Sequence, residues 1–295
     1  MKTRISSHSH KPRRMRFLAG ALALASVLAA TPLSAGNGRL AVADGVEIHY
    51  QQAGRGSAVI FVHGGFMDAE MWDKQFREFA RSHRAVRFDL RGFGKSDRGE
   101  KPFQPTEDIA ALLDHLKIER AHIVGLSMGG SVAIDFALAH PERTASLVVA
   151  EPGVSGYAWG PEVLDTMRAV RQAFENGGKE AAIESLLSRP VFATLKDKPA
   201  ASKEVRRQLE RNLSDSPPLM EPPEKPALDR LSEIRSPTLL LVSEHSGEDA
   251  HKIASLLQEK VDGLRRMRIP DSGHMINLEQ PDAFNQVVLD FLASI

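Results

Sequence analysis

The chain has 295 residues, of which 42% are hydrophobic, and it contains no cysteine. This length and hydrophobic content suffice for one sizeable core, so we expect a single domain with an insertion. The lack of cysteine excludes disulfides, thiolate metal sites, cysteine nucleophiles and a lipidated N-terminal cysteine. Any nucleophile must therefore be an oxygen or a nitrogen.

Charge is unevenly distributed along the chain, although its formal net value is +0. Residues 1–35 contain six basic residues and no acid, which leaves 32 Lys and Arg against 38 Asp and Glu in residues 36–295, a net charge of about −6. Duplex nucleic acids bind to a basic protein face. A mildly acidic body therefore argues against nucleic acid as a partner.

Residues 1–35 have the pattern of an export signal. A basic stretch precedes an apolar run from Phe17 to Ala30, and the small residues Ser34 and Ala35 follow. The apolar run has about 14 residues, whereas a membrane-spanning helix needs roughly 20. We therefore expect a cleaved signal and a periplasmic or secreted protein without stable membrane insertion. A retained membrane anchor is the alternative, and the sequence leaves the export route open.

From Arg39 onward, apolar β-rich runs alternate with stretches of helical periodicity. This alternation is typical of an α/β fold, a mostly parallel sheet covered by helices. Seven strands are predicted, at 46–53, 57–63, 84–90, 121–127, 145–151, 237–244 and 265–269. Helices are predicted at 106–118, 131–140, 162–175 and 248–260.

The alternation stops between Gly153 and Arg235, where strand patterns vanish and a proline-rich stretch follows a helix-like run. We expect residues 153–235 to form a helical lid, inserted into an α/β core made of residues 36–152 and 236–295. The alternative is an irregular linker without a functional role, but loops of this length in compact domains are usually functional or disordered.

The motif Gly125-Leu126-Ser127-Met128-Gly129-Gly130 lies directly after one predicted strand and directly before a predicted helix. A serine in such a sharp turn needs glycine neighbours to avoid steric conflict, and its hydroxyl projects at the top of the sheet. The positive end of the helix dipole behind it favours an alkoxide and a developing oxyanion. Ser127 is therefore the predicted nucleophile.

A second glycine motif, Phe61-Val62-His63-Gly64-Gly65-Phe66, ends an early strand. Its glycines allow the backbone to approach a reacting carbonyl, and the N–H groups of Phe66 and Met128 are predicted to form an oxyanion hole. We expect His63 to brace its own loop rather than to act as the base. The stretch 89–97, Asp-Leu-Arg-Gly-Phe-Gly-Lys-Ser-Asp, likewise suits a tight turn and is given no catalytic role.

The predicted general base is His274, within 270–275, Pro-Asp-Ser-Gly-His-Met. It is one of eleven histidines, so its position decides the assignment. It follows the last predicted strand, and the chain order of nucleophile, acid and histidine is used by hydrolases of this topology.

His63-Gly64-Gly65, the stretch 89–96, Gly125 to Gly130 and Gly273-His274 together resemble the α/β-hydrolase superfamily, particularly its cofactor-free serine branch of esterases and lactonases. The resemblance covers residues 39–295 except the lid. It implies an eight-stranded, mostly parallel sheet with the lid after the sixth strand, and an acyl-enzyme mechanism with no metal or organic cofactor.

Departures from related families narrow the expected activity. Ser127 stands where epoxide hydrolases and haloalkane dehalogenases have aspartate, and Phe66-Met67 stands where prolyl aminopeptidases usually have Pro-Gly. Hydrolysis of a small-molecule carboxylic ester or lactone is the leading hypothesis. The alternatives are C–C bond hydrolysis or perhydrolysis on the same residues, or small-molecule binding without turnover, because a fold alone does not decide function.

The acid of the expected triad is displaced. In many relatives an aspartate follows the strand equivalent to 237–244, and Ser246 stands at that position here. Glu151 ends the predicted strand 145–151, which the resemblance places beside the nucleophile strand, and it is the predicted acid. The alternative is that Glu151 only braces the start of the lid. Glu248 and Asp249 are the alternative acids, although they also suit the first turn of a helix. The proline that follows Glu151 is expected to keep its backbone extended.

The first prediction concerns export. Because a basic segment precedes a short apolar run and small residues, we expect cleavage near Ala35 and recovery of a soluble mature protein outside the cytoplasm. N-terminal sequencing or intact mass of the exported material checks this. A full-length species held in the membrane would show that the segment is an anchor.

Overall fold

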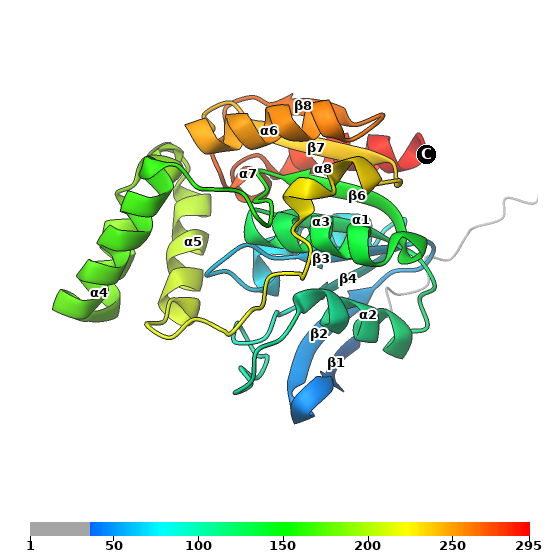
Figure 1. The fold of residues 1–295 in the computed structure, drawn as a ribbon, viewed down its shortest axis with the longest axis horizontal. Coiled ribbons are helices and arrows are strands. Elements are labelled where there is room, and N and C mark those ends of the chain that lie inside the picture. The colour runs from blue at the N-terminus through cyan, green and yellow to red at the C-terminus, as the bar shows by residue number, and fades with distance from the viewer. Residues whose placement is uncertain (1–35) are drawn as a thin grey trace, which may run out of the picture. The chain divides into compact units, whose positions relative to one another are not determined.

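The computed structural model describes residues 36–295, so the predicted signal lies outside the described residues. Eight strands form one sheet in the order β1-β2-β4-β3-β5-β6-β7-β8 (Figure 1). β2 pairs antiparallel with both β1 and β4, and all other neighbours are parallel. The strands are β1 Gly36–Ala41, β2 Glu47–Ala53, β3 Ala58–Val62, β4 Arg84–Phe88, β5 Ala121–Leu126, β6 Thr144–Ala150, β7 Thr238–Ser243 and β8 Arg265–Ile269.

The seven strands predicted from hydrophobic pattern are confirmed, with ends that differ by at most two residues. The eighth, β1, has the sequence Gly-Asn-Gly-Arg-Leu-Ala and lies at the edge of the sheet. Its two glycines and lack of an apolar run give no strand pattern, because an edge strand gains its order from pairing with its neighbour. Its partner is β2, from Gly36 opposite Gln52 to Ala41 opposite Glu47.

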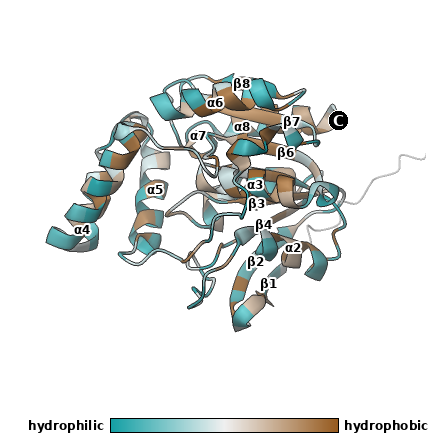
Figure 2. Ribbon diagram, viewed as in Figure 1, coloured by the Kyte–Doolittle hydropathy of each residue, from teal (hydrophilic) through white to brown (hydrophobic). Residues whose placement is uncertain are grey.

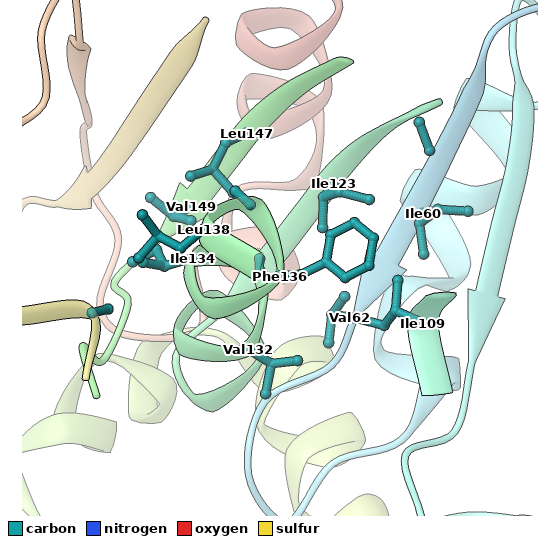
Figure 3. Packing of buried hydrophobic residues seen from close by; sticks show 14 of the residues in the cluster. Ile60, Val62, Ile109, Ile123, Val132, Ile134, Phe136, Leu138, Leu147 and Val149 are labelled. Carbon is teal, nitrogen blue, oxygen red and sulfur yellow. The ribbon is translucent and has the colours of Figure 1, made fainter. Parts of the chain in front are cut away.

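Helices cover both faces of the sheet because buried parallel strands present apolar side chains on both sides. On β3, Ile60 and Val62 face the helices α2, α3 and α6, whereas Val59 and Phe61 face α1 and α8. Phe136 of α3 lies among the buried side chains of the first face (Figure 3). These helices are α1 Asp73–Phe79, α2 Pro105–His115, α3 Met128–Ala139, α6 Glu248–Lys260 and α8 Pro281–Ala293, with the short α7 Ile276–Glu279 before α8.

The insertion between β6 and β7 is helical. It contains α4 Pro161–Leu187, a 3₁₀ segment Pro190–Asp197 and α5 Pro199–Asn212. Figure 1 shows α4 and α5 beside each other, and Figure 2 shows many hydrophilic residues on α4. Within α4 the backbone breaks at Gly178, whose φ is 74°. Only an isolated bridge, between Phe103 and Met220, adds β structure to residues 153–235.

Helix α5 holds the insertion to the loop after β3 through a buried polar network. Asp68 accepts hydrogen bonds from Asn212 Nδ2 at 2.8 Å and pairs with Arg211 Nε at 2.8 Å, and its own N–H donates to Gln208 Oε1 at 3.0 Å. Apolar residues of the insertion also join the core on the α1 and α8 face. A packed insertion of this kind differs from the irregular linker considered above. Within residues 36–295, no helix is long and apolar enough to cross a membrane.

A buried ion pair fixes the loop after β4 to α2. Arg91 Nε donates to Asp108 Oδ2 at 2.7 Å and Nη2 donates to Oδ1 at 2.6 Å, and both side chains are almost fully buried. The guanidinium also stacks on Phe103, 4.6 Å from the ring centre. Removing one partner of such a pair leaves an uncompensated charge in the interior.

The second prediction follows from this pair. Asp108→Asn should lower the free energy of unfolding by about 3–5 kcal/mol, because Arg91 loses its counter-charge. Asp114→Asn is the matched control, since Asp114 is exposed and pairs with Arg143, and its cost should be about 0–1 kcal/mol. Urea denaturation of both variants measures the difference. Equal costs would contradict the argument.

Candidate active site

Ser127 lies in a sharp turn between the end of β5 and the start of α3. Its φ is 55° and its ψ is −119°, a conformation that side-chain-bearing residues rarely adopt. Such strain persists only when the surrounding structure enforces it, and it is concentrated at functional sites. The Ser127 N–H donates to Ala150 O at 2.9 Å, which fixes the turn to the end of β6.

The glycines around Ser127 are required by close backbone contacts. A Cβ on Gly125 would lie 2.2 Å from Gly129 O, and one on Gly129 would lie 2.2 Å from Val62 O. A Cβ on Gly130 would lie 2.8 Å from the Pro152 Cβ. The prediction that glycine neighbours avoid steric conflict at this turn is therefore confirmed.

The glycine loop after β3 lies against the same turn. A Cβ on Gly64 would be 3.7 Å from the Ser127 Cβ, and one on Gly65 would be 3.7 Å from Met128 Sδ. Phe66 has a φ of 61° in a turn that the Met67 N–H closes onto Gly64 O at 3.2 Å. Within residues 36–295, the N–H groups of Phe66 and Met128 donate to no protein acceptor. Both remain available to a ligand beside Ser127.

His63 is buried and braces its loop, as predicted. Its Nδ1 is 2.8 Å from Gly64 O, and its Nε2 is 3.0 Å from the N–H of Leu90. These two contacts require Nδ1 to carry the proton and Nε2 to accept. Burial lowers the pKa of His63, which favours the neutral ring. With both ring nitrogens engaged, His63 cannot serve as the base.

Asp89, like His63, stabilises its own loop, here the turn after β4. Its carboxylate accepts the N–H of Ala69 at 2.8 Å and that of Lys95 at 2.9 Å. Gly94 has a φ of 56°, and a Cβ there would lie 2.4 Å from the Asp89 Oδ2. The predicted tight turn of residues 89–97 is thus confirmed.

His274 and Glu151 face each other at the end of the sheet. His274 Nδ1 lies 3.8 Å from Glu151 Oε2, an ion-pair separation that is longer than a hydrogen bond. The Glu151 side chain is only 1% exposed and that of His274 is 22% exposed. Burial by itself raises the pKa of Glu151, but His274 and the hydroxyl and N–H donors around the carboxylate lower it to below its ordinary value. These partners therefore favour the ionised form of Glu151.

Ser246 and Ser243 hold the other oxygen of this carboxylate. Glu151 Oε1 accepts the Ser246 hydroxyl at 2.6 Å and the Ser243 N–H at 2.7 Å. The position after β7 that carries aspartate in many relatives thus supplies a hydrogen bond to a carboxylate from β6. The two serine hydroxyls also contact each other, at 2.8 Å.

The expectation of an extended backbone at Glu151 is wrong, because its φ is 46°. The preference imposed by a following proline is local, whereas here tertiary hydrogen bonds hold the turn at the end of β6. The Glu151 N–H donates to Leu241 O and the Gly153 N–H donates to Ser127 O, both at 3.1 Å. Six non-glycine residues of the described part have positive φ, and four of them, Phe66, Ser127, Glu151 and Asp271, follow parallel strands. Backbone strain is therefore concentrated at the carboxyl ends of the parallel strands, where this site lies.

The alternative acids are engaged elsewhere. Glu248 pairs with Lys252 at 2.6 Å on the surface of α6. Asp249 accepts the Tyr157 hydroxyl at 3.0 Å and the Gly160 N–H at 2.9 Å, which fixes the start of α4. The structure brings Glu151 to His274 and does not bring Glu248 or Asp249 there.

The insertion contributes aromatic side chains near its origin. Tyr157 and Trp159 contact each other edge to face, with ring centres 5.4 Å apart. A Cβ on Gly153 would lie 3.4 Å from the Trp159 ring, and the Gly153 N–H donates to Ser127 O at 3.1 Å. Trp159 is 40% exposed, so an apolar surface remains near the nucleophile turn.

One residue at the site has no signature in the sequence. Glu279, on α7, accepts hydrogen bonds from the backbone on both sides of His274. Its position five residues after the histidine follows no hydrophobic or glycine pattern, so only the folded turn reveals it.

The sheet order, the strained serine turn and the paired His274 and Glu151 define an α/β-type hydrolase. Residues 59–287 match the Alpha/beta hydrolase family, and the chain belongs to that family. The protein is thus a hydrolase, and its eight-stranded sheet is the one expected from its motifs.

Curated relatives are named as hydrolases of different substrates. The chain is 28% identical over 266 residues to a 2-hydroxy-6-oxo-6-phenylhexa-2,4-dienoate hydrolase of Burkholderia cepacia, covering 84% of this chain and 91% of that protein. It is 27% identical over 250 residues to a carboxylesterase of Bacillus subtilis, covering 80% of each. The fold is similar to that of a thermophilic esterase from Thermogutta terrifontis, with a TM-score of 0.75 and 24% identity over 88% of this chain and 98% of that one.

The third prediction concerns the packed turn. Gly129→Ala should lower stability by about 1–3 kcal/mol and reduce labelling of the serine by a fluorophosphonate, because its Cβ would collide with Val62 O. Gly36→Ala is the control, since its Cβ would meet only ordinary contacts with Gln52, and it should behave as wild type. Thermal unfolding and labelling rates are the measurements. A Gly129→Ala protein with wild-type values would contradict the role of this contact.

Proposed function

We propose that the protein hydrolyses a small-molecule carboxylic ester or lactone through an acyl-enzyme on Ser127. The observation that carries the proposal is the pairing of His274 with the buried carboxylate of Glu151, which directly follows the residue that accepts the Ser127 N–H. A nucleophile, a base oriented by an anion and two unengaged N–H groups are the parts that acyl transfer needs.

In the first half-reaction, Ser127 Oγ attacks the carbonyl carbon while His274 Nε2 takes the hydroxyl proton. The N–H groups of Phe66 and Met128 stabilise the negative charge that develops on the carbonyl oxygen. As the tetrahedral intermediate collapses, His274 returns the proton to the leaving alkoxide, which departs as an alcohol. With a lactone the alcohol stays attached to the acyl chain.

In the second half-reaction, water attacks the acyl-enzyme while His274 accepts one of its protons. Collapse of the new intermediate breaks the bond to Ser127, which recovers its proton from His274, and the acid is released. Glu151 stays ionised throughout. It orients the ring through Nδ1 and stabilises the imidazolium that forms in each half-reaction.

Ester or lactone cleavage requires fewer catalytic groups than C–C bond cleavage, because an alkoxide needs only the proton from His274 in order to leave. The similarity to a carboxylesterase supports this choice. The similarity to a 2-hydroxy-6-oxo-6-phenylhexa-2,4-dienoate hydrolase supports C–C bond hydrolysis as the second candidate. That reaction additionally requires stabilisation of a carbon leaving group.

We further propose that residues 153–235 act as a lid, with Trp159 at the edge of an apolar substrate pocket. The position of Trp159 against Gly153, next to the nucleophile turn, supports this role. The export segment expected from the sequence would place the activity in the periplasm or outside the cell.

A substrate panel tests the proposed reaction. Mature protein is incubated with p-nitrophenyl esters of graded acyl length, with lactones, and with 2-hydroxy-6-oxo-6-phenylhexa-2,4-dienoate. Ser127→Ala is the control for each. Ester or lactone turnover that is lost in Ser127→Ala supports the proposal, whereas cleavage of the dienoate alone selects the second candidate. Failure to turn over any compound or to react with a fluorophosphonate would indicate a binding protein.

The fourth prediction identifies the acid. Glu151→Gln should lower kcat by roughly 10⁴, because an amide neither stabilises the imidazolium nor holds the correct tautomer. Glu248→Gln and Asp249→Asn change equivalent groups outside the contact with His274, and their kcat should stay within about tenfold of wild type. Steady-state kinetics on a p-nitrophenyl ester decide between them. A large loss at Glu248 or Asp249, with Glu151→Gln active, would refute the assignment.

A further inference from the structure

The loop that presents His274 is held by a buried carboxylate on the residue that ends α7. Glu279 Oε2 accepts the Gly273 N–H at 2.8 Å, and Oε1 accepts the Met275 N–H at 3.1 Å. Glu279 is 7% exposed. One side chain thus forms hydrogen bonds with the backbone immediately before and immediately after the histidine.

We propose that Glu279 is a positioning residue, which sets the place and direction of the His274 ring by bridging these two N–H groups. The inference rests on the proposed role of His274 as the base. Glu279 touches neither substrate nor the reacting atoms in this account. It acts through the backbone from which the imidazole projects.

The other side-chain anchors of the loop lie farther from the histidine, although the backbone O of Met275 also accepts the N–H groups of Leu278 and Glu279, both at 2.9 Å. The Asp271 N–H donates to Glu244 Oε2 at 2.8 Å, and the Ser272 hydroxyl donates to Ile269 O at 2.7 Å. The side chain of Asp271 also pairs with Lys198 of the insertion. These contacts fix residues 271 and 272. Within residues 36–295, the N–H groups of Gly273 and Met275 donate hydrogen bonds only to Glu279.

The charge of Glu279 has no basic side chain as its partner. Within the described residues it forms no ion pair, and its hydrogen-bond donors at the loop are backbone N–H groups. Both oxygens are used at once, so an isosteric amide cannot replace it, because the amide nitrogen would meet one N–H with another donor. A shorter carboxylate keeps the charge but cannot span both donors.

The consequence for catalysis is geometric. His274 must reach both Ser127 and Glu151, and the separation of 3.8 Å from Glu151 leaves little room for drift. Displacement of a reacting group by about 1 Å can cost roughly 10²-fold in rate. Glu279 is 7% exposed and both of its oxygens bind N–H groups of the loop, so we expect it to make no contact with the acyl and alcohol groups. Loss of Glu279 should therefore lower kcat and leave KM nearly unchanged.

The experiment compares Glu279→Gln and Glu279→Asp with the matched control Glu244→Gln, whose single bond to the loop an amide oxygen can preserve. Hydrolysis of p-nitrophenyl butyrate gives kcat and KM, a fluorophosphonate gives the rate of serine labelling, and thermal unfolding gives Tm. Both Glu279 variants should lose about 10- to 100-fold in kcat and in labelling rate, with KM within about twofold of wild type. Glu244→Gln should stay within about twofold in all three quantities.

Two results would overturn the inference. If both Glu279 variants fold and keep kcat within about twofold of wild type, with a change only in Tm, Glu279 serves the fold alone. If kcat falls equally in Glu244→Gln, no special grip on His274 exists. Should Glu279→Gln fail to fold, Glu279→Asp decides. A wild-type protein that neither hydrolyses the ester nor reacts with the fluorophosphonate refutes the proposed function itself, which distinguishes the two failures.

Discussion

The site depends on one buried anion, the carboxylate of Glu151 at the end of β6. A charge at 1% exposure is tolerable only when its oxygens are paired and hydrogen-bonded. Ser246 and the Ser243 N–H satisfy one oxygen, and His274 faces the other. The same anion that needs this shell for its own solvation is therefore oriented toward the imidazole. The hydrogen bonds that stabilise the buried carboxylate also direct its other oxygen toward the His274 ring.

Backbone strain and close packing support that arrangement. Ser127 and Glu151 both have positive φ at the ends of neighbouring strands, and the Ser127 N–H is bonded to Ala150 O. The glycines beside them allow α3 to approach β3 and β6 more closely than any side chain would permit. Strain of this kind costs about 1–3 kcal/mol per residue and is retained where the surroundings enforce it. The buried core on both faces of the sheet supplies that enforcement.

Much of this could be predicted from the sequence because its determinants are local. Apolar periodicity located seven strands, and glycines around Ser127 indicated the turn. The serine at the usual acid position indicates that the carboxylate comes from elsewhere, and Glu151 ends the neighbouring strand. The positive φ of Glu151 does not follow from the proline after it, because hydrogen bonds to Leu241 and Ser127 hold the turn and override a local preference. The edge strand β1 is ordered by its pairing with β2, and the contacts of Glu279 with the loop exist only in the folded turn, so neither leaves a pattern in the chain.

The central claim is that Ser127 is a nucleophile activated by His274. Mass spectrometry of peptides from fluorophosphonate-treated protein tests it most directly, because the adduct reports the residue that attacks. The account predicts a single adduct on the peptide that contains Ser127, and its loss in His274→Ala. An unmodified wild-type protein, or an adduct on another residue, would contradict it.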